Sequence, residues 1–261
     1  MCHRLVECPT CDLVFADQPP DEASLAQSYH AADYDSSQEA DDAARSYIEA
    51  IAPILSMIKK GRALEIGTGT GVFLEHLSNA GFEHVEGIEP SKKAIAAAPE
   101  NRRLWIRKGM FNESDYAPES FDLICCFMTM EHVHDPLMVA ESAMRLLRPG
   151  GVFVTVTHDR RSGLNKLLGH RSPIIDIEHM QLFSSKSISY LFGKVGYINV
   201  FTSAFSNRYA FRYWLRLCPF PSFLKKTILA IVSYIGLANY KLTLNVGNSL
   251  SVGFKPGEGA H

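Results

Sequence analysis

The sequence predicts a doubly wound α/β fold, in which helices cover both faces of a mostly parallel sheet. Short apolar runs alternate with helical segments from about residue 40 onward, and Phe121 to Met128 is typical of a buried strand. With 261 residues, 46% of them hydrophobic, the chain can bury one large core. This composition excludes a collagen, a disulfide mini-protein and a disordered tail.

Local patterns predict the elements in chain order. A polar, turn-rich start is interrupted by Pro19-Pro20, and apolar residues at helical spacing then predict a helix from Asp41 to Lys59. The predicted strands are Ala63–Ile66, Val85–Glu89, Leu104–Ile106, Phe121–Met128, Val152–Thr157, Tyr197–Thr202 and Ser249–Phe254. The predicted helices are Val72–Ala80, Ser91–Ala98, Pro136–Leu147, Ser185–Val195, and about 208–217 and 222–237. Ser91 is the expected N-cap of its helix.

These elements divide the chain into four regions. We expect an N-terminal extension over 1–36, an α/β core over 37–205, a basic and aromatic helical insert over 206–240, and the last strand with a tail over 241–261.

A glycine-rich loop follows the first predicted strand. Gly67, Gly69 and Gly71 let the backbone turn tightly and approach a ligand, and the helix start offers N–H groups to it. Their G-x-G-x-G spacing differs from the G-x-G-x-x-G of dinucleotide binding. Two acids lie at strand ends: Glu65 in the first predicted strand and Glu89 at the end of the next one. A carboxylate at the position of Glu89 can accept hydrogen bonds from both hydroxyls of a ribose. A tight turn without a ligand is the alternative interpretation.

Five motifs in order resemble the class I S-adenosylmethionine-dependent methyltransferases, in particular the ubiquinone-type branch. Leu64 to Gly71 with Gly87 to Ser91 resembles their cofactor signature, and Phe121 to Ile124 followed by Met130 to Pro136 is similar to their fourth-strand motif. Further similarity lies in Leu147 to Gly151 and in Glu178 to Ser184. The resemblance covers about 40–205 and the last strand. It implies a Rossmann-like seven-stranded sheet whose last strand is antiparallel, with a helical cap inserted before that strand.

The resemblance also implies roles for individual residues. Gly67, Gly69 and Gly71 would wrap the methionine and ribose, Glu65 would lie near the ammonium, and Glu89 would hold the ribose diol. The other cofactor contacts expected are Thr68, Pro90, Met110, Phe111 and Met128. Met110 stands where relatives often carry an acid for the adenine amine, so Asn112 or Glu113 is expected to replace that contact.

The implied reaction is an in-line methyl transfer from S-adenosylmethionine to a small-molecule acceptor, with oxygen favoured as the acceptor atom. His132 and His179 are the predicted catalytic residues, because an unperturbed histidine titrates in the useful range. His134 and His158 are weaker candidates. Tyr29 and Tyr34 resemble aromatic residues that close over the cofactor, and packing is their alternative role. The alternative functions are a nicotinamide-dependent oxidoreductase and a non-catalytic cofactor-binding relative.

The cysteines suggest a reducing compartment. Cys125 and Cys126 are adjacent in a buried strand, so we expect reduced thiols, and with no apolar run of secretory length at the start we expect a cytoplasmic protein. Cys8-Pro9-Thr10-Cys11 resembles half of a zinc ribbon, to which Cys2 or His3 would have to add ligands. We therefore expect no metal at the active site, and regard zinc at the N-terminus as the less favoured possibility.

The charge is unevenly distributed along the chain. Residues 179–257 contain nine Lys and Arg and no Asp or Glu, although the whole chain has a net charge of −2. Arg208, Arg212 and Arg216, spaced by four, are expected to share one helix face. Residues 208–238 would therefore contact a lipid-like or anionic acceptor or a membrane surface, or else form a cap packed on the core. Thr227 to Tyr240 is too short to span a membrane, and no nucleic-acid partner is expected.

Overall fold

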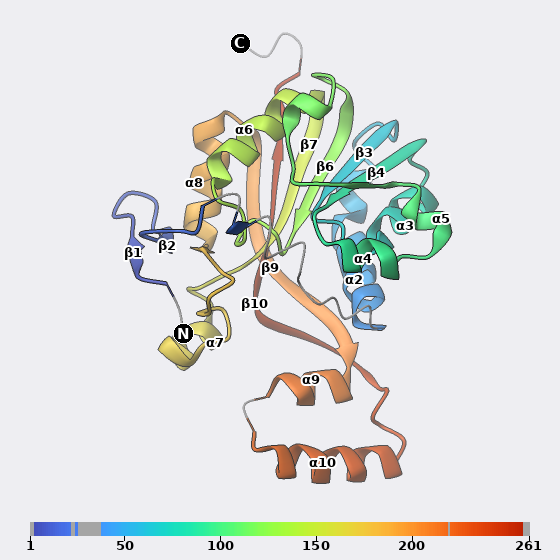
Figure 1. The fold of residues 1–261 in the computed structure, drawn as a ribbon, viewed down its shortest axis with the longest axis vertical. Helices are drawn as coiled ribbons and strands as arrows, with labels where there is room; N and C mark the ends of the chain where they lie inside the picture. The colour runs from blue at the N-terminus through green and yellow to red at the C-terminus, as the bar shows by residue number, and fades with distance from the viewer. Residues whose placement is uncertain (1–2, 22–23, 26–37, 219, 258–261) are drawn as a thin grey trace.

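A seven-stranded sheet forms the centre of the molecule (Figure 1). The computed structural model describes residues 3–21, 24–25, 38–218 and 220–257. The strand order is β5-β4-β3-β6-β7-β10-β9, and β10 pairs antiparallel with both of its neighbours while the other strands are parallel, as predicted. The strands are β3 (Arg62–Ile66), β4 (His84–Glu89), β5 (Ile106–Lys108), β6 (Phe121–Phe127), β7 (Leu147–His158), β9 (Ile198–Ala210) and β10 (Lys241–Phe254).

Helices cover both faces of this sheet. Alternate residues of β6 enter two separate hydrophobic clusters: Ile124 and Cys126 pack toward α6 and α8, and Leu123 and Cys125 pack toward α2 and α3. Both cysteines are buried free thiols. The helices are α2 (Gln38–Leu55), α3 (Val72–Asn79), α4 (Lys92–Ala97), α5 (Glu100–Arg103), α6 (Pro136–Leu146), α7 (Gly163–Leu168), α8 (Ser185–Val195), α9 (Phe211–Leu217) and α10 (Ser222–Tyr234). None of the helices in the described ranges is long and apolar enough to cross a bilayer.

Local capping sets the helix starts near the site. The Ser91 hydroxyl accepts the N–H of Ala94 and begins α4, as predicted. Asp135 caps α6 in the same way, and Ser184 forms a capping box with Ser187 at the start of α8.

The structure corrects several boundaries. The third strand lies at Ile106–Lys108 rather than 104–106, because the chain is still turning at Trp105. The last two strands are much longer than predicted, since β9 and β10 pair with each other over a length that their own apolar pattern did not indicate. Arg208 therefore belongs to β9, and it does not share a helix face with Arg212 and Arg216.

The helical insert projects from the sheet instead of covering it. His158, the last residue of β7, is level with Asn248 of β10 and Phe205 of β9. Beyond this level β9 and β10 continue as a two-stranded ribbon to the pair Ala210–Lys241. Ala210 lies five residues after Phe205 along β9, which corresponds to about 17 Å of extended strand. The ribbon end with α9 and α10, residues 208–244, is called the terminal lobe below, and it lies at the bottom of Figure 1. The expected cap before the last strand is thus present in the chain, but it does not pack on the core.

A second, small sheet joins the N-terminus to the core. Its order is β1-β2-β8, from β1 (Leu5–Glu7), β2 (Val14–Ala16) and β8 (Gln181–Leu182). β8 belongs to the segment between β7 and α8, so the N-terminal hairpin is attached directly to a loop beside the carboxyl ends of the main strands.

Candidate active site

A large cavity lies at the carboxyl ends of the parallel strands. The strand order reverses between β3 and β6, and ligands of open α/β sheets bind at such a point. The cavity has a volume of about 1430 Å³ and is lined from the ends of β3, β4 and β6 and from α6. Pockets for one drug-sized ligand measure roughly 300–1,000 Å³, so this one has room for a cofactor and an acceptor.

The glycine-rich loop reaches the cavity through Gly67. Gly67, Gly69 and Gly71 all adopt positive φ, at 79°, 57° and 70°, which side chains other than glycine rarely tolerate. A Cβ on Gly67 would collide with the Oγ1 of Thr129, a cavity-lining residue that no sequence motif indicated. Gly67 is therefore required by a close approach as well as by its backbone conformation.

Glu89 holds the glycine loop against the end of β4. Its carboxylate accepts the N–H of Gly69 and the N–H of Ser91, each at 2.8 Å. The residue is 8% exposed, and burial raises the pKa of its carboxyl. Glu89 lines the cavity, and each of its oxygens keeps a further lone pair for a ligand hydroxyl.

Glu65 lies one layer deeper. Its carboxylate accepts the hydroxyl of Thr68, and burial raises the pKa of Glu65 to about 8. Thr68 in turn packs where a side chain on Gly87 would lie. Glu65, Thr68, Gly69 and Gly71 are not among the described residues that line the cavity.

The opposite wall is apolar. Pro90, Met110 and Phe111 line the cavity as expected, and Met110 is 41% exposed. Met128 does not line it: its φ of 49° breaks the strand alternation, and its side chain packs against the cluster that contains Phe127 on the far face. Thr129 takes the place in the cavity wall that was predicted for Met128.

The two candidates for the adenine contact are already bonded. The Asn112 side chain accepts the N–H of Ser114, and Glu113 is paired with Arg145 at 3.0 Å. Both line the cavity, and Asn112 keeps its amide N–H₂ group as a donor. Where relatives often carry an acid for the adenine amine, this chain has Met110, and the nearby carboxylate of Glu113 is already paired with Arg145.

Three histidines meet beside the cavity from three segments. The ring of His179, before β8, lies 4.7 Å from that of His132, after β6, and 5.4 Å from that of His158, at the end of β7. His132 and His134 line the cavity, whereas His179 lies behind His132 and is 12% exposed. The two predicted catalytic residues are therefore in contact, with His132 nearer to the ligand space.

Hydrogen bonds determine the tautomers of these rings. His132 Nδ1 lies 2.9 Å from the carbonyl oxygen of Glu178, and a carbonyl only accepts, so Nδ1 carries the proton and the neutral ring has its lone pair on Nε2. His179 Nδ1 likewise lies 2.9 Å from Asp176 Oδ1. Burial and the neighbouring His132 lower the pKa of His179 to about 4, so His179 is neutral at pH 7.

A buried acid lies beneath the histidines. Glu131 is 1% exposed, and its Oε1 accepts the N–H of His158 at 2.6 Å. Its Oε2 has no hydrogen-bond partner in the part of the chain that the structure describes, and burial raises the pKa of this carboxyl. The backbone oxygen of Glu131 also accepts the N–H groups of Met180 and Gln181, which ties the His179 segment to the end of β6.

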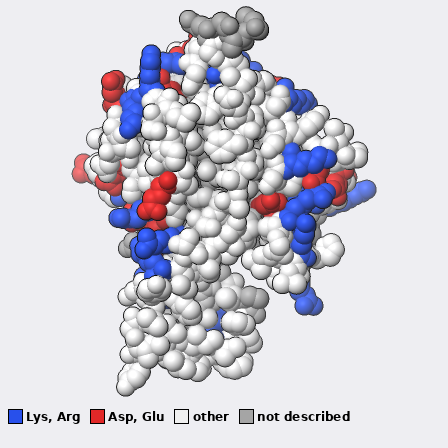
Figure 2. All heavy atoms as spheres, turned by 180° about the vertical axis from the view of Figure 1, so that it is seen from behind, with Lys and Arg blue, Asp and Glu red and all other residues white. Residues whose placement is uncertain are grey.

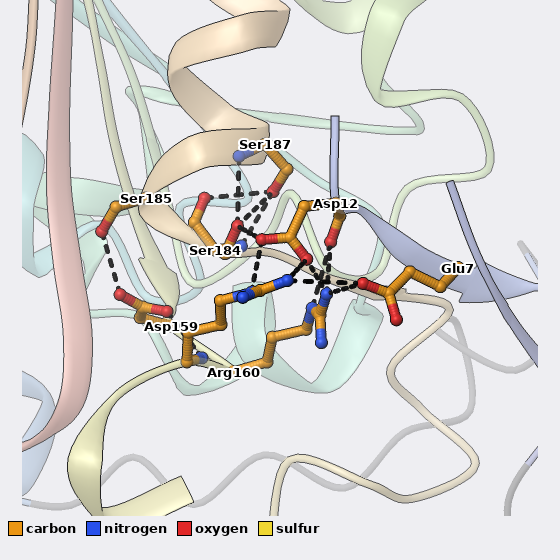
Figure 3. Close-up of polar contacts among 8 residues, drawn as sticks. Glu7, Asp12, Asp159, Arg160, Ser184, Ser185 and Ser187 are labelled. Atoms are coloured by element: carbon orange, nitrogen blue, oxygen red, sulfur yellow. Dashed lines mark hydrogen bonds and ion pairs between the residues drawn. The ribbon is translucent and has the colours of Figure 1, made fainter. Parts of the chain in front are cut away.

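The N-terminal hairpin holds that same segment from the other side (Figure 3). Asp12 is 3% exposed and pairs with Arg160 and Arg161, and its carboxylate accepts the Ser184 hydroxyl at 3.0 Å. Arg160 also reaches Glu7 at 2.6 Å. Since Ala16 N–H donates to the Met180 carbonyl, the hairpin positions the loop that carries His179.

The N-terminal cysteines supply two thiols. Hydrogen bonds from the backbone of Cys11 and Thr10 lower the pKa of Cys8. Within the described residues no group of three metal-binding side chains is found, and His3 Nε2 instead lies 2.9 Å from the Ile177 carbonyl. Cys2, Tyr29 and Tyr34 lie outside the described residues.

The cavity is acidic. Among the described residues, five carboxylates line it, against one guanidinium, that of Arg145. The acids are Glu89, Glu113, Asp115, Asp135 and Glu178. This balance favours a positively charged ligand.

Comparisons with known proteins agree with this geometry. A family model described as "Methyltransferase domain" matches residues 37–200. The ubiquinone biosynthesis O-methyltransferase of Thiobacillus denitrificans is 32% identical over 120 residues, and that of Vibrio cholerae is 28% identical over 116. Each match covers 41% of this chain and about half of the relative, 50% and 47%.

Solved structures share the fold at low sequence identity. An S-adenosylmethionine-dependent methyltransferase from Archaeoglobus fulgidus superposes with a TM-score of 0.55 and 12% identity, over 90% of this chain and all of that one. One from Thermotoga maritima gives a TM-score of 0.54 and 22% identity, over 83% and 91% of the two chains.

Proposed function

This chain belongs to the class I S-adenosylmethionine-dependent methyltransferases, and from that premise we propose that it methylates an oxygen atom of a small, uncharged, lipid-like acceptor, with His132 as the general base. The observation that carries the proposal is the His132 ring in the cavity wall, held by the Glu178 carbonyl in the tautomer whose Nε2 can accept a proton. Family membership sets aside the nicotinamide-dependent alternative.

The residues present fit the methyl donor. Gly67 presents backbone without a side chain to the cavity, the Glu89 carboxylate can accept hydrogen bonds from ribose hydroxyls, and the acidic lining complements a cation. When bound, S-adenosylmethionine supplies an electrophilic methyl group on a sulfonium, and its transfer to the acceptor breaks the carbon–sulfur bond and leaves S-adenosylhomocysteine.

The histidine pair supports proton removal from a hydroxyl. Two rings 4.7 Å apart resist carrying two positive charges, and the low pKa of His179 keeps that ring neutral. A proton taken from the acceptor would therefore stay on His132 Nε2. His179, fixed by Asp176, is a positioning residue in this scheme.

The lining supports an uncharged acceptor over an anionic one. Val133, Ile177 and Met180 surround the His132 side of the cavity with apolar surface. The carboxylates of the cavity wall would repel an anion at close range. The enzyme would be cytoplasmic and would meet a lipid-like acceptor at a membrane surface through residues 208–238.

A transfer assay tests this proposal. The enzyme is incubated with S-adenosylmethionine labelled in its methyl group and with a total bacterial lipid extract, and label is followed into the organic phase. We expect lipid-soluble label that resists mild acid, as an ether does. Label that appears only in water-soluble amines would refute the proposal, and so would the absence of label transfer by a protein that binds S-adenosylhomocysteine.

His132→Gln tests the base. We expect kcat to fall by about 100-fold or more, the usual contribution of a general base, while affinity for S-adenosylhomocysteine stays within threefold. His134→Gln is the matched control, since His134 lines the same cavity two residues away. Equal turnover in the two variants would remove His132 from the mechanism.

A further inference from the structure

The terminal lobe carries an exposed apolar stripe. On α10, Phe223, Ile231 and Tyr234 are 70%, 57% and 93% exposed, and their spacing of eight and three residues places them on one helix face. The inner face carries Leu224, Ile228 and Val232, which are half-buried. No residue of α10 is buried, so this helix presents a mostly apolar outer surface without a partner in the described chain.

Hydrogen bonds and an ion pair connect the lobe to the rest of the chain in spite of this exposure. The Trp214 indole N–H donates to the Leu242 carbonyl at 2.9 Å, and the N–H of Phe211 donates to the Tyr240 carbonyl at 2.9 Å. At its base, Lys241 pairs with the buried Asp42 of α2. These contacts tie α9 and the ribbon end to the sheet, and α10 is joined to α9 by a hydrogen bond from Lys225 Nζ to the Arg216 carbonyl at 2.7 Å.

Basic residues accompany the apolar stripe. The terminal lobe contains six Lys and Arg and, like all of residues 179–257, no Asp or Glu. They are Arg208, Arg212, Arg216, Lys225, Lys226 and Lys241. On the face drawn in Figure 2 the described atoms of the lobe, at the bottom of the view, are nearly all uncharged. The lobe thus combines a broad uncharged surface with an exclusively positive set of charged side chains.

We propose that the terminal lobe docks on an anionic lipid bilayer, with the outer face of α10 at the headgroup boundary. Aromatic and aliphatic side chains flanked by Lys and Arg bind such surfaces. A second copy of the chain is disfavoured as the occupant, because it would bring two positively charged lobes together.

Docking would bring the cavity close to the membrane. The ribbon extends from the carboxyl ends of the strands, the same edge at which the cavity lies. In this respect the inference rests on the proposed function, since an enzyme with a lipid-like acceptor would meet it at the bilayer. The docking itself requires neither cofactor nor acceptor.

Vesicle flotation tests the docking without either ligand. The full chain is mixed with phosphatidylcholine vesicles or with vesicles that also contain phosphatidylglycerol. We expect flotation with the anionic vesicles only, reduced by high salt. Failure to float, or equal flotation with neutral vesicles, would overturn the proposal.

Variants locate the contact. The triple variant Phe223→Ser, Ile231→Ser, Tyr234→Ser should lose at least tenfold of its vesicle affinity. Leu104→Ser is the control, because Leu104 is 84% exposed before β5, outside the lobe. Undiminished flotation of the triple variant would contradict the assignment. Light scattering that shows a dimer dissolved by the triple substitution, without flotation, would instead assign the face to a second copy.

The same samples separate the two proposals. Binding of S-adenosylhomocysteine and label transfer to detergent-dispersed lipid are measured beside flotation. Transfer without flotation would overturn only the docking, and flotation without transfer would overturn only the proposed acceptor.

Discussion

Replacement of Glu89 tests the assignment of the cofactor site most directly. The carboxylate accepts two backbone N–H groups at 2.8 Å and, by our assignment, would accept two ribose hydroxyls. A hydrogen bond to a charged group contributes about 1.5–3 kcal/mol, so loss of both ribose bonds corresponds to at least about 3 kcal/mol, or roughly 100-fold in Kd. We expect Glu89→Ala to weaken S-adenosylhomocysteine binding by about that factor in calorimetry.

The same change should also affect the fold. Glu89→Ala leaves the N–H groups of Gly69 and Ser91 without their acceptor, at about 1–3 kcal/mol for each buried group. Glu89→Gln keeps one carbonyl acceptor, so it should retain more of the stability while still losing roughly tenfold in affinity. The two variants together distinguish a lost ligand contact from a loosened loop.

Glu86→Ala is the matched control for Glu89→Ala. Glu86 lies three residues earlier in β4 and pairs at 2.6 Å with Arg62 near the surface, an interaction that contributes about 0–1 kcal/mol. Its variant should bind S-adenosylhomocysteine normally. If a well-folded Glu89→Ala protein bound within threefold of the unmodified chain, the reasoning about the ribose would be refuted.

Three further predictions concern protons and the N-terminal hairpin. Burial raises the pKa of Glu65 to about 8, so its carboxyl is mostly protonated at pH 7, and an ammonium beside it, as the family resemblance implies, would favour the charged form. Affinity for S-adenosylhomocysteine should then rise between pH 6 and 8, and Glu65→Gln should remove that rise in calorimetry. The pKa of His179 is about 4 in the folded chain and about 6.5 in the unfolded chain, so the neutral ring stabilises the fold fully above pH 6.5 and this stabilisation is lost as the pH falls toward 4. In urea unfolding, the free energy of unfolding of His179→Gln should therefore fall less between pH 6.5 and pH 4 than that of the unmodified chain. Asp12→Ala removes the buried carboxylate that pairs with Arg160 and Arg161 and accepts the Ser184 hydroxyl, and it should cost about 3–5 kcal/mol in urea unfolding. Asp17→Ala, which breaks an exposed pair, should cost under about 1 kcal/mol.

Features that are local in the sequence could be predicted from it. The buried strand at β6 and the glycine loop each depend on a few consecutive residues, and both lie where expected. Met128 shows where this reasoning fails. One residue in the left-handed region after β6 reverses the alternation, so Met128 stays on the face of Phe127 and Thr129 reaches the cavity. No sequence pattern predicts the positive φ of Met128.

Features that depend on distant segments were only partly predictable. His132 and His179 could each be selected by type and motif, but their ring contact depends on β8 being held by an N-terminal hairpin more than 160 residues away in the sequence. The length of the ribbon could likewise not be predicted from the sequence, because β9 and β10 stabilise each other over residues that carry no clear strand pattern.

The ribbon separates the acidic cavity from the basic terminal lobe. An acidic cavity attracts a cationic cofactor, and a basic lobe would attract an anionic surface, so the two fields would weaken each other if they overlapped. The ribbon carries the lobe about 17 Å past the end of β7, whereas charges are screened over about 8 Å at physiological ionic strength. At that separation each field acts on its own ligand. Cofactor binding and vesicle binding should therefore be independent at physiological salt, with the affinity for S-adenosylhomocysteine unchanged by anionic vesicles that contain no acceptor.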